Sequence, residues 1–506
     1  MKPADSGTSQ PVLTEPPRFV EGPTLRNPDN PALRLVQILA VETDRPVSIR
    51  LTLSTELETR TLDAAELSAS HALPVIGLRS ETAYGLQVVA TDEGGRQVTA
   101  DLDYTTGPLP EPFPDIEVLH HEPARVSPGH TLLDTRSKLG DHNLLMILDE
   151  TLAPIWIYMG YWRDARMTEA GTIIGIVDDG EVLEVDLAGT VVGHWVGEGG
   201  DGDVVVDVPS FSHEVFPVDD GFWSLTFATT QVDAYPTSYD SPLDLGPALD
   251  INDPVVVHVS WEGAVLDAWR MASRLDTQRI GYDALNPTQF GPDWGHANAV
   301  VVDPSDGGVL VSLRHQDAVV KFDAVGEVQW ILGNHEGWQA SFQPFLLTPV
   351  GDDFAWPYHQ HAPELTAEGD LILFDNGNVR ETPYGAPAAD PAVYSRVVSY
   401  RVDPTAMTVE QLWEYRDTLT GDLKTTAVGD ADQLENGSVL ADFGLVVSEG
   451  GVVNKNLGLA FRSARLIEFD PAAPEVPALD LRISAPQGDP TDGWRTFRAE
   501  RIPSIY

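Results

Sequence analysis

Residues 296–330 read HANAVVVDPSDGGVLVSLRHQDAVVKFDAVGEVQW, and this stretch contains the pattern that decides the fold. Short runs of apolar and β-branched residues follow one another in it. Turns rich in Asp and Gly separate these runs at residues 303–308 and 323–326. Runs of this kind, bounded by such turns, are typical of antiparallel strands joined by hairpins. The stretch therefore predicts a small antiparallel sheet of four strands.

The same pattern recurs along most of the chain, with little helical periodicity between its copies. Six units begin near His130, Arg166, His213, His296, His361 and Asp430. Their closing strands lie at residues 153–156, 190–195, 264–269, 327–330, 409–413 and 478–483. Repeats of about 35 to 80 residues with four strands each are the signature of a β-propeller. We therefore predict an all-β fold in which residues 117–506 form a six-bladed β-propeller, with the first strand of each unit lining the central channel.

A smaller domain is expected before the propeller. Residues 47–53 and 84–90 alternate apolar and polar side chains, as half-buried strands do. Residues 19–107 are therefore predicted to form a small N-terminal β-sandwich of the fibronectin III or immunoglobulin type. The surroundings of Tyr84 resemble the corner of fibronectin type III domains, where a tyrosine bonds back to the backbone.

Two segments are expected to lie outside these domains. Residues 1–18 are polar and rich in Ser, Thr and Pro, and they predict a flexible tail. This tail has no basic segment followed by an apolar run, so we expect no signal peptide in it. The proline-rich residues 108–116 predict a stiff linker. No run of about 18 apolar residues occurs, so no membrane-spanning segment is expected.

The composition argues against several partners and several kinds of chemistry. The net charge is −47, from 78 acidic and 31 basic residues spread along the chain. Such a field repels nucleic acids and anionic membranes, so neither is expected as a partner. The chain has no cysteine, which excludes disulfides, thiol chemistry, zinc–thiolate sites and iron–sulfur clusters. The acidic surface indicates a marine or salt-tolerant source, with plain solubility as the alternative explanation.

Three histidines fall at the same position of consecutive units. His213, His296 and His361 each stand at the start of the first strand of their unit, whereas the sixth unit carries Asp430 there. This phase points the three imidazoles at one another across the predicted channel. Neutral imidazoles could bind a metal such as zinc or copper, with Asp375 as an extra ligand. Alternatively, one imidazole is a nucleophile and another a proton donor, because imidazole titrates near neutral pH.

Arg314 favours the second of these two uses. It ends an apolar strand next to the strand of His296, where it would repel a divalent metal ion. Beside a sulfate or phosphate group its guanidinium fork matches two oxyanion oxygens. An ion pair with a nearby acid, such as Asp317, is the alternative role. We find no compact carboxylate set for magnesium and no Gly-rich phosphate loop, so nucleotide donors are disfavoured. These residues indicate an oxyanion site and group transfer.

These residues lie in motifs that resemble those of the bacterial arylsulfate sulfotransferases, which need no PAPS or other nucleotide donor. The similar segments are residues 293–300, 312–322, 330–333, 337–338, 360–361, 373–377, 395–396 and 498–504. The resemblance extends from about residue 117 to the C-terminus. It implies a six-bladed propeller preceded by a small β-sandwich. It also implies sulfuryl transfer from an aryl sulfate to a phenol, by a ping-pong mechanism through a sulfohistidine.

The resemblance further implies a role for each candidate residue. His361, in the Gln-His motif, would attack sulfur and carry the sulfuryl group. His296, in the motif His-x-Asn, would protonate the departing phenolate and later deprotonate the acceptor phenol. Arg314 and His213 would hold the sulfuryl oxygens, and Asn298 would orient the site.

His359 is a rival for His361, since residues i and i+2 share one face of a strand. The strand phase and the Gln-His motif favour His361. The resemblance implies no metal and no cofactor, aryl sulfates and phenols as partners, and a periplasmic or exported location, and it leaves a homodimer open. The absence of cysteine removes a disulfide that some members of the family carry. Two other functions stay open: a metal-dependent propeller hydrolase or lyase, and a non-catalytic propeller that binds a ligand.

Overall fold

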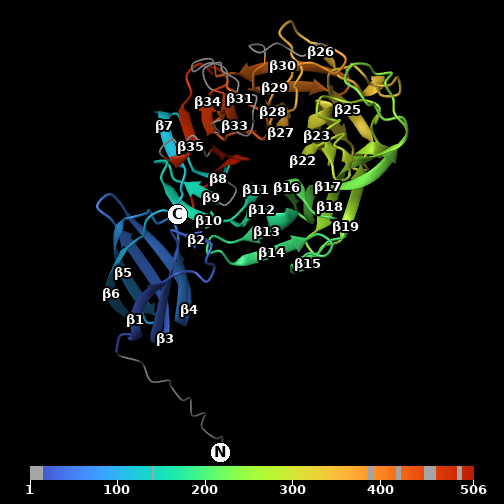
Figure 1. The fold of residues 1–506 in the computed structure, drawn as a ribbon. Helices are drawn as coiled ribbons and strands as arrows, with labels where there is room; N and C mark the ends of the chain where they lie inside the picture. The colour runs from blue at the N-terminus through green and yellow to red at the C-terminus, as the bar shows by residue number, and fades with distance from the viewer. Residues whose placement is uncertain (1–14, 139–141, 386–392, 418–422, 449–462, 487–492) are drawn as a thin grey trace, which may run out of the picture. The chain divides into compact units, whose positions relative to one another are not determined.

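The computed structural model describes residues 15–138, 142–385, 393–417, 423–448, 463–486 and 493–506. In these residues the regular structure is β-strand apart from short 3-10 helices, which confirms the predicted all-β class. No helix in the described part of the chain is long and apolar enough to cross a membrane. The chain divides into two compact units, Met1–Leu109 with Tyr506, and Pro110–Ile505 (Figure 1). The predicted flexible tail falls almost wholly outside the described residues.

The first unit is a sheet built around one long strand. Its strands are β1 (Phe19–Arg26), β3 (Gln37–Ser54), β4 (Thr59–Val75), β5 (Ala83–Asp92) and β6 (Gln97–Thr105). β3 pairs with β1, β4 and β5, and β5 pairs with β6. Alternate side chains of β3 and β5 are buried in an apolar core. The hydroxyl of Tyr84 accepts a hydrogen bond from the backbone N–H of Arg79 at 2.9 Å. That contact confirms the tyrosine corner expected from the sequence.

The described part of the second unit contains six sheets of at least four strands, arranged around a common centre (Figure 1). The strands nearest the centre are β37 (Ala499–Ile502), β11 (Trp162–Met167), β16 (Ser212–Val218), β22 (Ala297–Val302), β27 (His361–Leu365) and β32 (Asp430–Gln433). This arrangement is consistent with a β-propeller.

Three further strands continue each sheet outward. In the same order they are β8 (His130–Ser137), β9 (Asn143–Leu148) and β10 (Pro154–Met159); β12 (Ile173–Val177), β13 (Glu181–Val185) and β14 (Val191–Val196); β17 (Gly221–Val232), β18 (Leu249–Ser260) and β19 (Val265–Arg270); β23 (Val309–Leu313), β24 (Ala318–Phe322) and β25 (Val328–Gly333); β28 (Leu371–Asp375), β29 (Arg396–Asp403) and β30 (Thr408–Tyr415); β33 (Val439–Ser448), β34 (Ser463–Phe469) and β35 (Leu479–Ser484).

The strands from the two ends of the second unit differ from the prediction for the inner strand of its first sheet. The strand beginning at His130 was expected to line the channel, but β37 pairs with β8 and lies on its inner side. At the other end, β7 (Asp115–His121) pairs with β35 and starts inside the predicted linker. Strands from both ends of the unit are thus built into sheets made mostly of distant residues. Local sequence spacing cannot reveal such pairing, because it depends on contacts between opposite ends of the chain.

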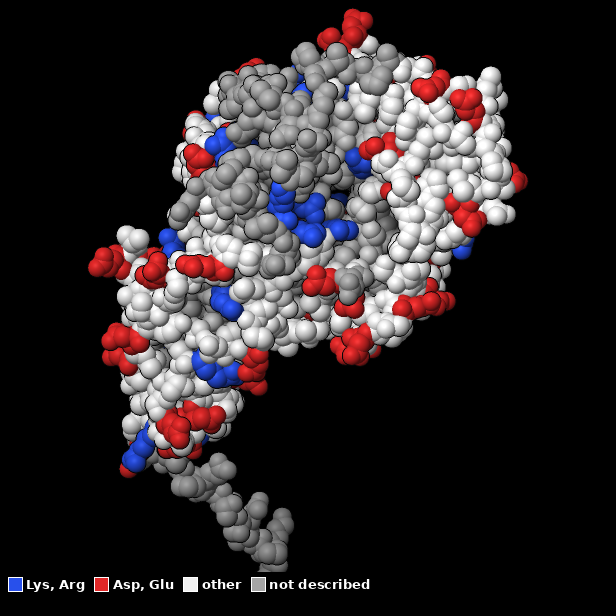
Figure 2. Space-filling view, in the orientation of Figure 1, with Lys and Arg blue, Asp and Glu red and all other residues white. Residues whose placement is uncertain are grey.

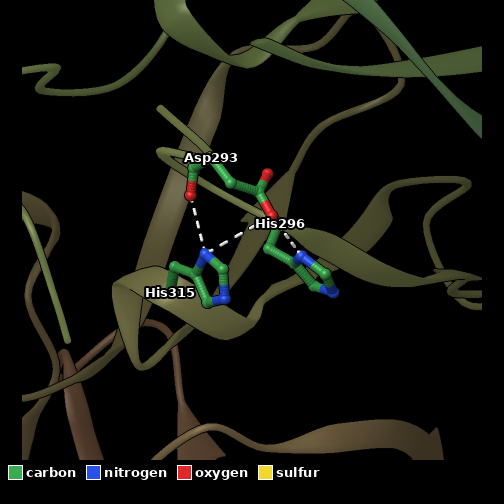
Figure 3. Close-up of side chains that lie close together, drawn as sticks. All are labelled: Asp293, His296 and His315. Carbon is green, nitrogen blue, oxygen red and sulfur yellow. Dashed lines mark hydrogen bonds and ion pairs between the residues drawn. The ribbon is translucent and has the colours of Figure 1, made fainter. Parts of the chain in front are cut away.

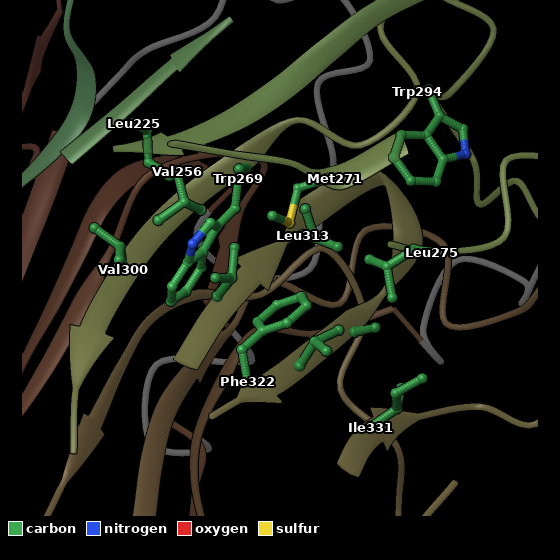
Figure 4. Packing of buried hydrophobic residues seen from close by; sticks show 14 of the residues in the cluster. Leu225, Val256, Trp269, Met271, Leu275, Trp294, Val300, Leu313, Phe322 and Ile331 are labelled. Atoms are coloured by element: carbon green, nitrogen blue, oxygen red, sulfur yellow. The ribbon is translucent and has the colours of Figure 1, made fainter. Parts of the chain in front are cut away.

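Apolar side chains fix the spacing between neighbouring sheets. Between the third and fourth sheets, Trp269 and Met271 lie in one buried cluster with Phe322 (Figure 4). Burying an apolar side chain of this size stabilises the fold by about 1.5–3 kcal/mol. This cluster therefore holds β16 at a fixed distance from β22, and these two strands position His213 and His296.

A buried charge network also crosses the inner strands. Glu214 of β16 is fully buried, pairs with Arg166, and accepts hydrogen bonds from Arg498 at 2.7 and 3.0 Å and from the N–H of Val300 at 3.2 Å. Removing one partner of a buried ion pair costs about 3–5 kcal/mol. Glu214→Ala should lower the free energy of unfolding by about that amount in chemical denaturation. The exposed Glu262→Ala should change it little, and equal losses in the two variants would contradict this account.

Candidate functional site

The histidines singled out in the sequence stand at the beginnings of three neighbouring inner strands. His213 is the second residue of β16, His296 immediately precedes β22, and His361 opens β27. The pairing register shifts within the first residues of each of these strands. His213 and His296 also have positive φ angles of 63° and 44°. Bulges and left-handed residues re-aim side chains and cluster near functional sites. Backbone irregularity therefore sets where these imidazoles point.

His213 and His296 lie face to edge, with ring centres 5.0 Å apart. Ser212 Oγ is 2.6 Å from His213 Nδ1. Burial lowers the pKa of His213 well below its usual range, and the charges of His296, His361 and Arg314 lower it further. The four residues thus act on one another electrostatically, and His213 is neutral at neutral pH.

His296 is held by a carboxylate. Its Nδ1–H donates to Asp293 Oδ2 at 2.5 Å, because a carboxylate can only accept, so Nε2 is the ring nitrogen left for other partners. Burial alone would raise the pKa of Asp293, but the bond from His296 lowers it. His315 packs beside His296 with ring centres 4.5 Å apart and donates Nδ1–H to the carbonyl of Asp293 at 2.6 Å (Figure 3). This arrangement can hold an imidazole in one tautomer and stabilise its protonated form.

The structure limits the metal alternative. Asp375, the expected extra ligand, is wrong for that role because it pairs with Arg396 at 2.8 Å and with Arg380 at 3.1 Å. Within the described residues, Asp293, His296 and His315 are the set of three whose ligand atoms lie within 4.8 Å of one another (Figure 3).

Arg314 is buried beside these histidines, and not all of its N–H groups are hydrogen-bonded within the described residues. One Nη lies 3.3 Å from Asp283 and 2.6 Å from His315 Nε2, and the other donates to the carbonyl of Thr426 at 3.1 Å. Its buried Nε–H has no hydrogen-bond partner among the described residues. Arg314 therefore has an acidic partner, as its alternative role predicts, but that partner is Asp283 and not Asp317. A buried N–H without a partner is costly, and an oxyanion would satisfy it.

His361 is 5% exposed, and its tautomer follows from its partner. The side-chain N–H groups of Asn376 donate to the carbonyl of Val428 at 2.9 Å and to Thr425 at 3.1 Å, which turns Asn376 Oδ1 toward the ring. His361 Nδ1–H donates to that oxygen at 2.6 Å, so its Nε2 carries the lone pair. Burial, then Arg314, lowers the pKa of His361 well below its usual range. This imidazole is therefore neutral at neutral pH and has the lone pair that a nucleophile needs.

The residues around His361 fix its backbone. Asn298 donates from its amide to the carbonyl of Gln360 at 2.8 Å. The amide of Gln360 donates in turn to Ser312 Oγ and to the carbonyl of Ala318, both at 3.0 Å. Asn298 thus acts on the peptide that precedes His361, while its own Oδ1 has no partner in the described part of the chain.

His359 occupies a different environment from its rival. It precedes β27, so the two residues do not share a strand face. Its ring nitrogens lie 3.0 Å from Asp317 and 3.3 Å from Asp283. Burial alone would lower the pKa of His359, but Asp317 and Asp283 outweigh it and raise the pKa. A protonated imidazole has no lone pair to offer, so His359 is poorly suited to attack an electrophile.

Asp430 opens β32, as His361 opens β27, so it takes the strand position expected from the repeat. It lines a cavity of about 410 Å³ with Glu364 of β27 and Asp432 of β32. Burial raises the pKa of Asp430, and the charges of Arg498 and Arg166 oppose this effect. The repeat alignment is therefore confirmed for Asp430, because His361 and Asp430 pair with the fourth residues of β28 and β33.

Four residues of the site were missed as functional candidates: Asn376, Asp293, His315 and Asp283. Asn376 and Asp293 lie inside segments already singled out at residues 373–377 and 293–300. His315 directly follows Arg314 in the sequence. The contacts of Asn376 with His361 and of Asp283 with Arg314 depend on tertiary structure, because these partners are distant in the sequence. Asp293 lies only three residues before His296, so the sequence placed it nearby.

Comparison with known proteins places the chain in a family. The family model described as Arylsulfotransferase (ASST) matches residues 162–484, which is more than half of the chain. Arylsulfate sulfotransferase AssT of Escherichia coli O6:H1 and that of Lelliottia amnigena are each 34% identical over 176 residues. These alignments cover 30% of this chain and 29% of each relative. A protein of unknown function from Bacteroides caccae has a TM-score of 0.35 at 11% identity, over 70% of this chain and 94% of that one. The family match shows that the chain belongs to the arylsulfotransferase family.

Proposed function

We propose that the protein transfers a sulfuryl group from an aryl sulfate to a phenol, without a nucleotide donor, in two steps through a sulfohistidine at His361. The observation that carries this proposal is the environment of His361. Its Nδ1–H donates to Asn376, its Nε2 has no hydrogen-bond partner among the described residues, and neither has the Nε–H of the buried Arg314 beside it. A neutral nucleophile next to an oxyanion donor is the arrangement that attack on a sulfate ester requires.

In the first step His361 Nε2 attacks sulfur, and the bond between sulfur and the aryl oxygen breaks. The electron pair of that bond goes to the departing phenolate oxygen. Protonated His296 gives its Nε2 proton to this oxygen, while Asp293 holds Nδ1. The products are a neutral phenol and a sulfuryl group on His361.

In the second step an acceptor phenol takes the place of the first one. His296 accepts the phenol proton at Nε2 as the phenol oxygen attacks sulfur. The bond between sulfur and His361 Nε2 breaks, and its electron pair returns to the ring. Both residues are then restored, and one channel admits the two phenols in turn, which gives ping-pong kinetics.

Arg314, His213 and Asn298 complete the proposed site. Sulfuryl transfer resembles phosphoryl transfer, in which positioning and charge stabilisation supply most of the catalysis. Arg314 and His213 would hold the sulfuryl oxygens, with Nε of Arg314 as a ready donor. Asn298 would keep the Gln360 peptide, and with it His361, in place.

We also propose the number of blades and the domain boundaries. We assign the six sheets of the second unit as six propeller blades over residues 117–506, and residues 19–107 as a β-sandwich joined by the linker 108–116. A periplasmic or exported location, a salt-tolerant source and a homodimer remain predictions.

A direct assay tests the proposal. The purified protein with 4-nitrophenyl sulfate should release 4-nitrophenol in the absence of any nucleotide, and added phenol should raise the rate and yield phenyl sulfate. The transfer should persist with a chelator present. No turnover across a range of phenols would refute the proposal, and turnover abolished by the chelator would instead favour a metal-dependent enzyme.

A further inference from the structure

Three arginines that the proposed reaction does not use lie together in the second unit. They are Arg136 of β8, Arg163 of β11 and Arg495 of β36 (Trp494–Arg495), and we call them the arginine cluster. The guanidinium groups of Arg136 and Arg163 lie 4.9 and 5.5 Å from the ring centre of Tyr161. Burial lowers the pKa of Arg495, and the charges of Arg136 and Arg163 lower it further, so the three cations are close enough to repel one another.

The charge of Asp134 acts on Arg495, but within the described residues no carboxylate forms an ion pair with the arginine cluster. Arg163 donates to the hydroxyl of Tyr161 at 2.5 Å, and none of the three arginines forms an ion pair within the described residues. The nearby Asp134 accepts backbone N–H groups of Phe497 and Arg498, and burial raises its pKa to about 7. In a chain with a net charge of −47, unpaired arginines are unexpected. Figure 2 shows Lys and Arg gathered at the central hollow, whereas Asp and Glu lie mostly toward the outside.

Phe497 connects the arginine cluster to the site of the histidines. Its ring centre lies 6.3 Å from the ring of His213 and 5.4 Å from the guanidinium carbon of Arg163. The charge of Arg163 also contributes to the low pKa of His213. An aromatic ring resting near Phe497 would therefore have one end at the histidines and the other at the arginines.

We propose that the arginine cluster is a second anion-binding subsite, which recognises a carboxylate, or a similar oxyanion, carried on the aromatic ring of the phenol. Guanidinium groups bind carboxylates and sulfates through paired, charge-assisted hydrogen bonds. Partial burial strengthens this attraction by reducing screening by solvent and salt. The preferred substrates are then anionic phenols and their sulfate esters. The inference rests on the proposed function for the reaction, but the binding itself does not need turnover.

The kinetic test compares a charged acceptor with a neutral one of the same shape. With 4-nitrophenyl sulfate as donor, Arg163→Gln should lower kcat/KM for 4-hydroxyphenylacetate by about tenfold or more, mainly through KM. The value for 4-hydroxyphenylacetamide should stay within about twofold. Arg401→Gln, which makes the same charge change at an exposed position, should alter neither. Arg136→Gln supplies a second variant if Arg163→Gln is misfolded by circular dichroism.

Equilibrium binding separates the two proposals. Calorimetric titration of 4-hydroxyphenylacetate at fixed ionic strength should give one site that Arg163→Gln and Arg136→Gln weaken and Arg401→Gln does not. Turnover with an unchanged preference between the two acceptors in both cluster variants would overturn the subsite and leave the proposed function standing. Binding that depends on Arg163, without any turnover, would support the subsite and refute the proposed function.

Discussion

Replacing His361 with Ala should lower kcat for sulfuryl transfer by at least about 10³-fold, because no other described group combines a free lone pair with this position. Removal of a catalytic nucleophile leaves only the catalysis due to binding and charge stabilisation. Stopped-flow measurement of 4-nitrophenol release should show a rapid burst in the wild-type protein and none in His361→Ala. Circular dichroism and thermal unfolding check that the variant is folded.

His359 lies two residues before His361, so the experiment must show which of the two imidazoles carries the sulfuryl group. Incubation with donor alone should add the mass of one SO₃ group to the peptide that contains both His359 and His361. Fragmentation of that peptide should place the added mass on His361. Label on His359, or a normal burst in His361→Ala, would show that the nucleophile has been assigned wrongly. The carboxylates on both sides of His359 make that outcome unexpected, because they favour its protonated form.

The sequence predicted the repeat well because the repeat is local. The turns and the β-branched runs of residues 296–330 specify β22 to β25 without reference to the rest of the chain. The strand β37 was missed for the opposite reason. Its four residues carry little periodicity, and their place inside β8 depends on pairing across the whole length of the unit.

The residues of the candidate site also differ in whether the sequence alone could predict them. His213, His296 and His361 could be found because each occupies the same phase of a repeated strand. Asn376 could not, since its role depends on contacts with Thr425 and Val428 that fix the direction of its amide. Spacing in the sequence locates side chains on strands, whereas tautomers and ion pairs depend on partners brought together by folding.

The net charge and the site appear contradictory until burial is considered. The net charge of −47 would repel a sulfate ester at long range. Salt screens that repulsion beyond about 10 Å, but it screens the buried Arg314 and its neighbours much less. His213 and His361 are neutral and add no charge, so the attraction at the site comes from Arg314. Local attraction can therefore outweigh the repulsion of the surface once the substrate has entered.

Replacing His296 with Ala should lower the rate of the first step by about 10²–10⁴-fold, and the loss should depend on the leaving group. A phenolate with a low conjugate-acid pKa leaves without help, so 4-nitrophenyl sulfate should lose least. Unsubstituted phenyl sulfate should lose most, because its phenolate needs the proton from His296. Single-turnover rates for a series of substituted aryl sulfates should therefore fall more steeply with leaving-group pKa in the variant than in the wild-type protein.

Asp293→Asn provides the matched comparison for that slope. It leaves the imidazole in place but replaces the carboxylate that accepts from Nδ1 at 2.5 Å, so protonated His296 loses its stabilising charge. Its rates should show the same dependence on leaving group with a smaller total loss. An equal loss for every leaving group in His296→Ala would assign His296 to positioning instead, since a residue that only orients the substrate gives no preference for poor leaving groups. The slope therefore tests proton transfer separately from binding.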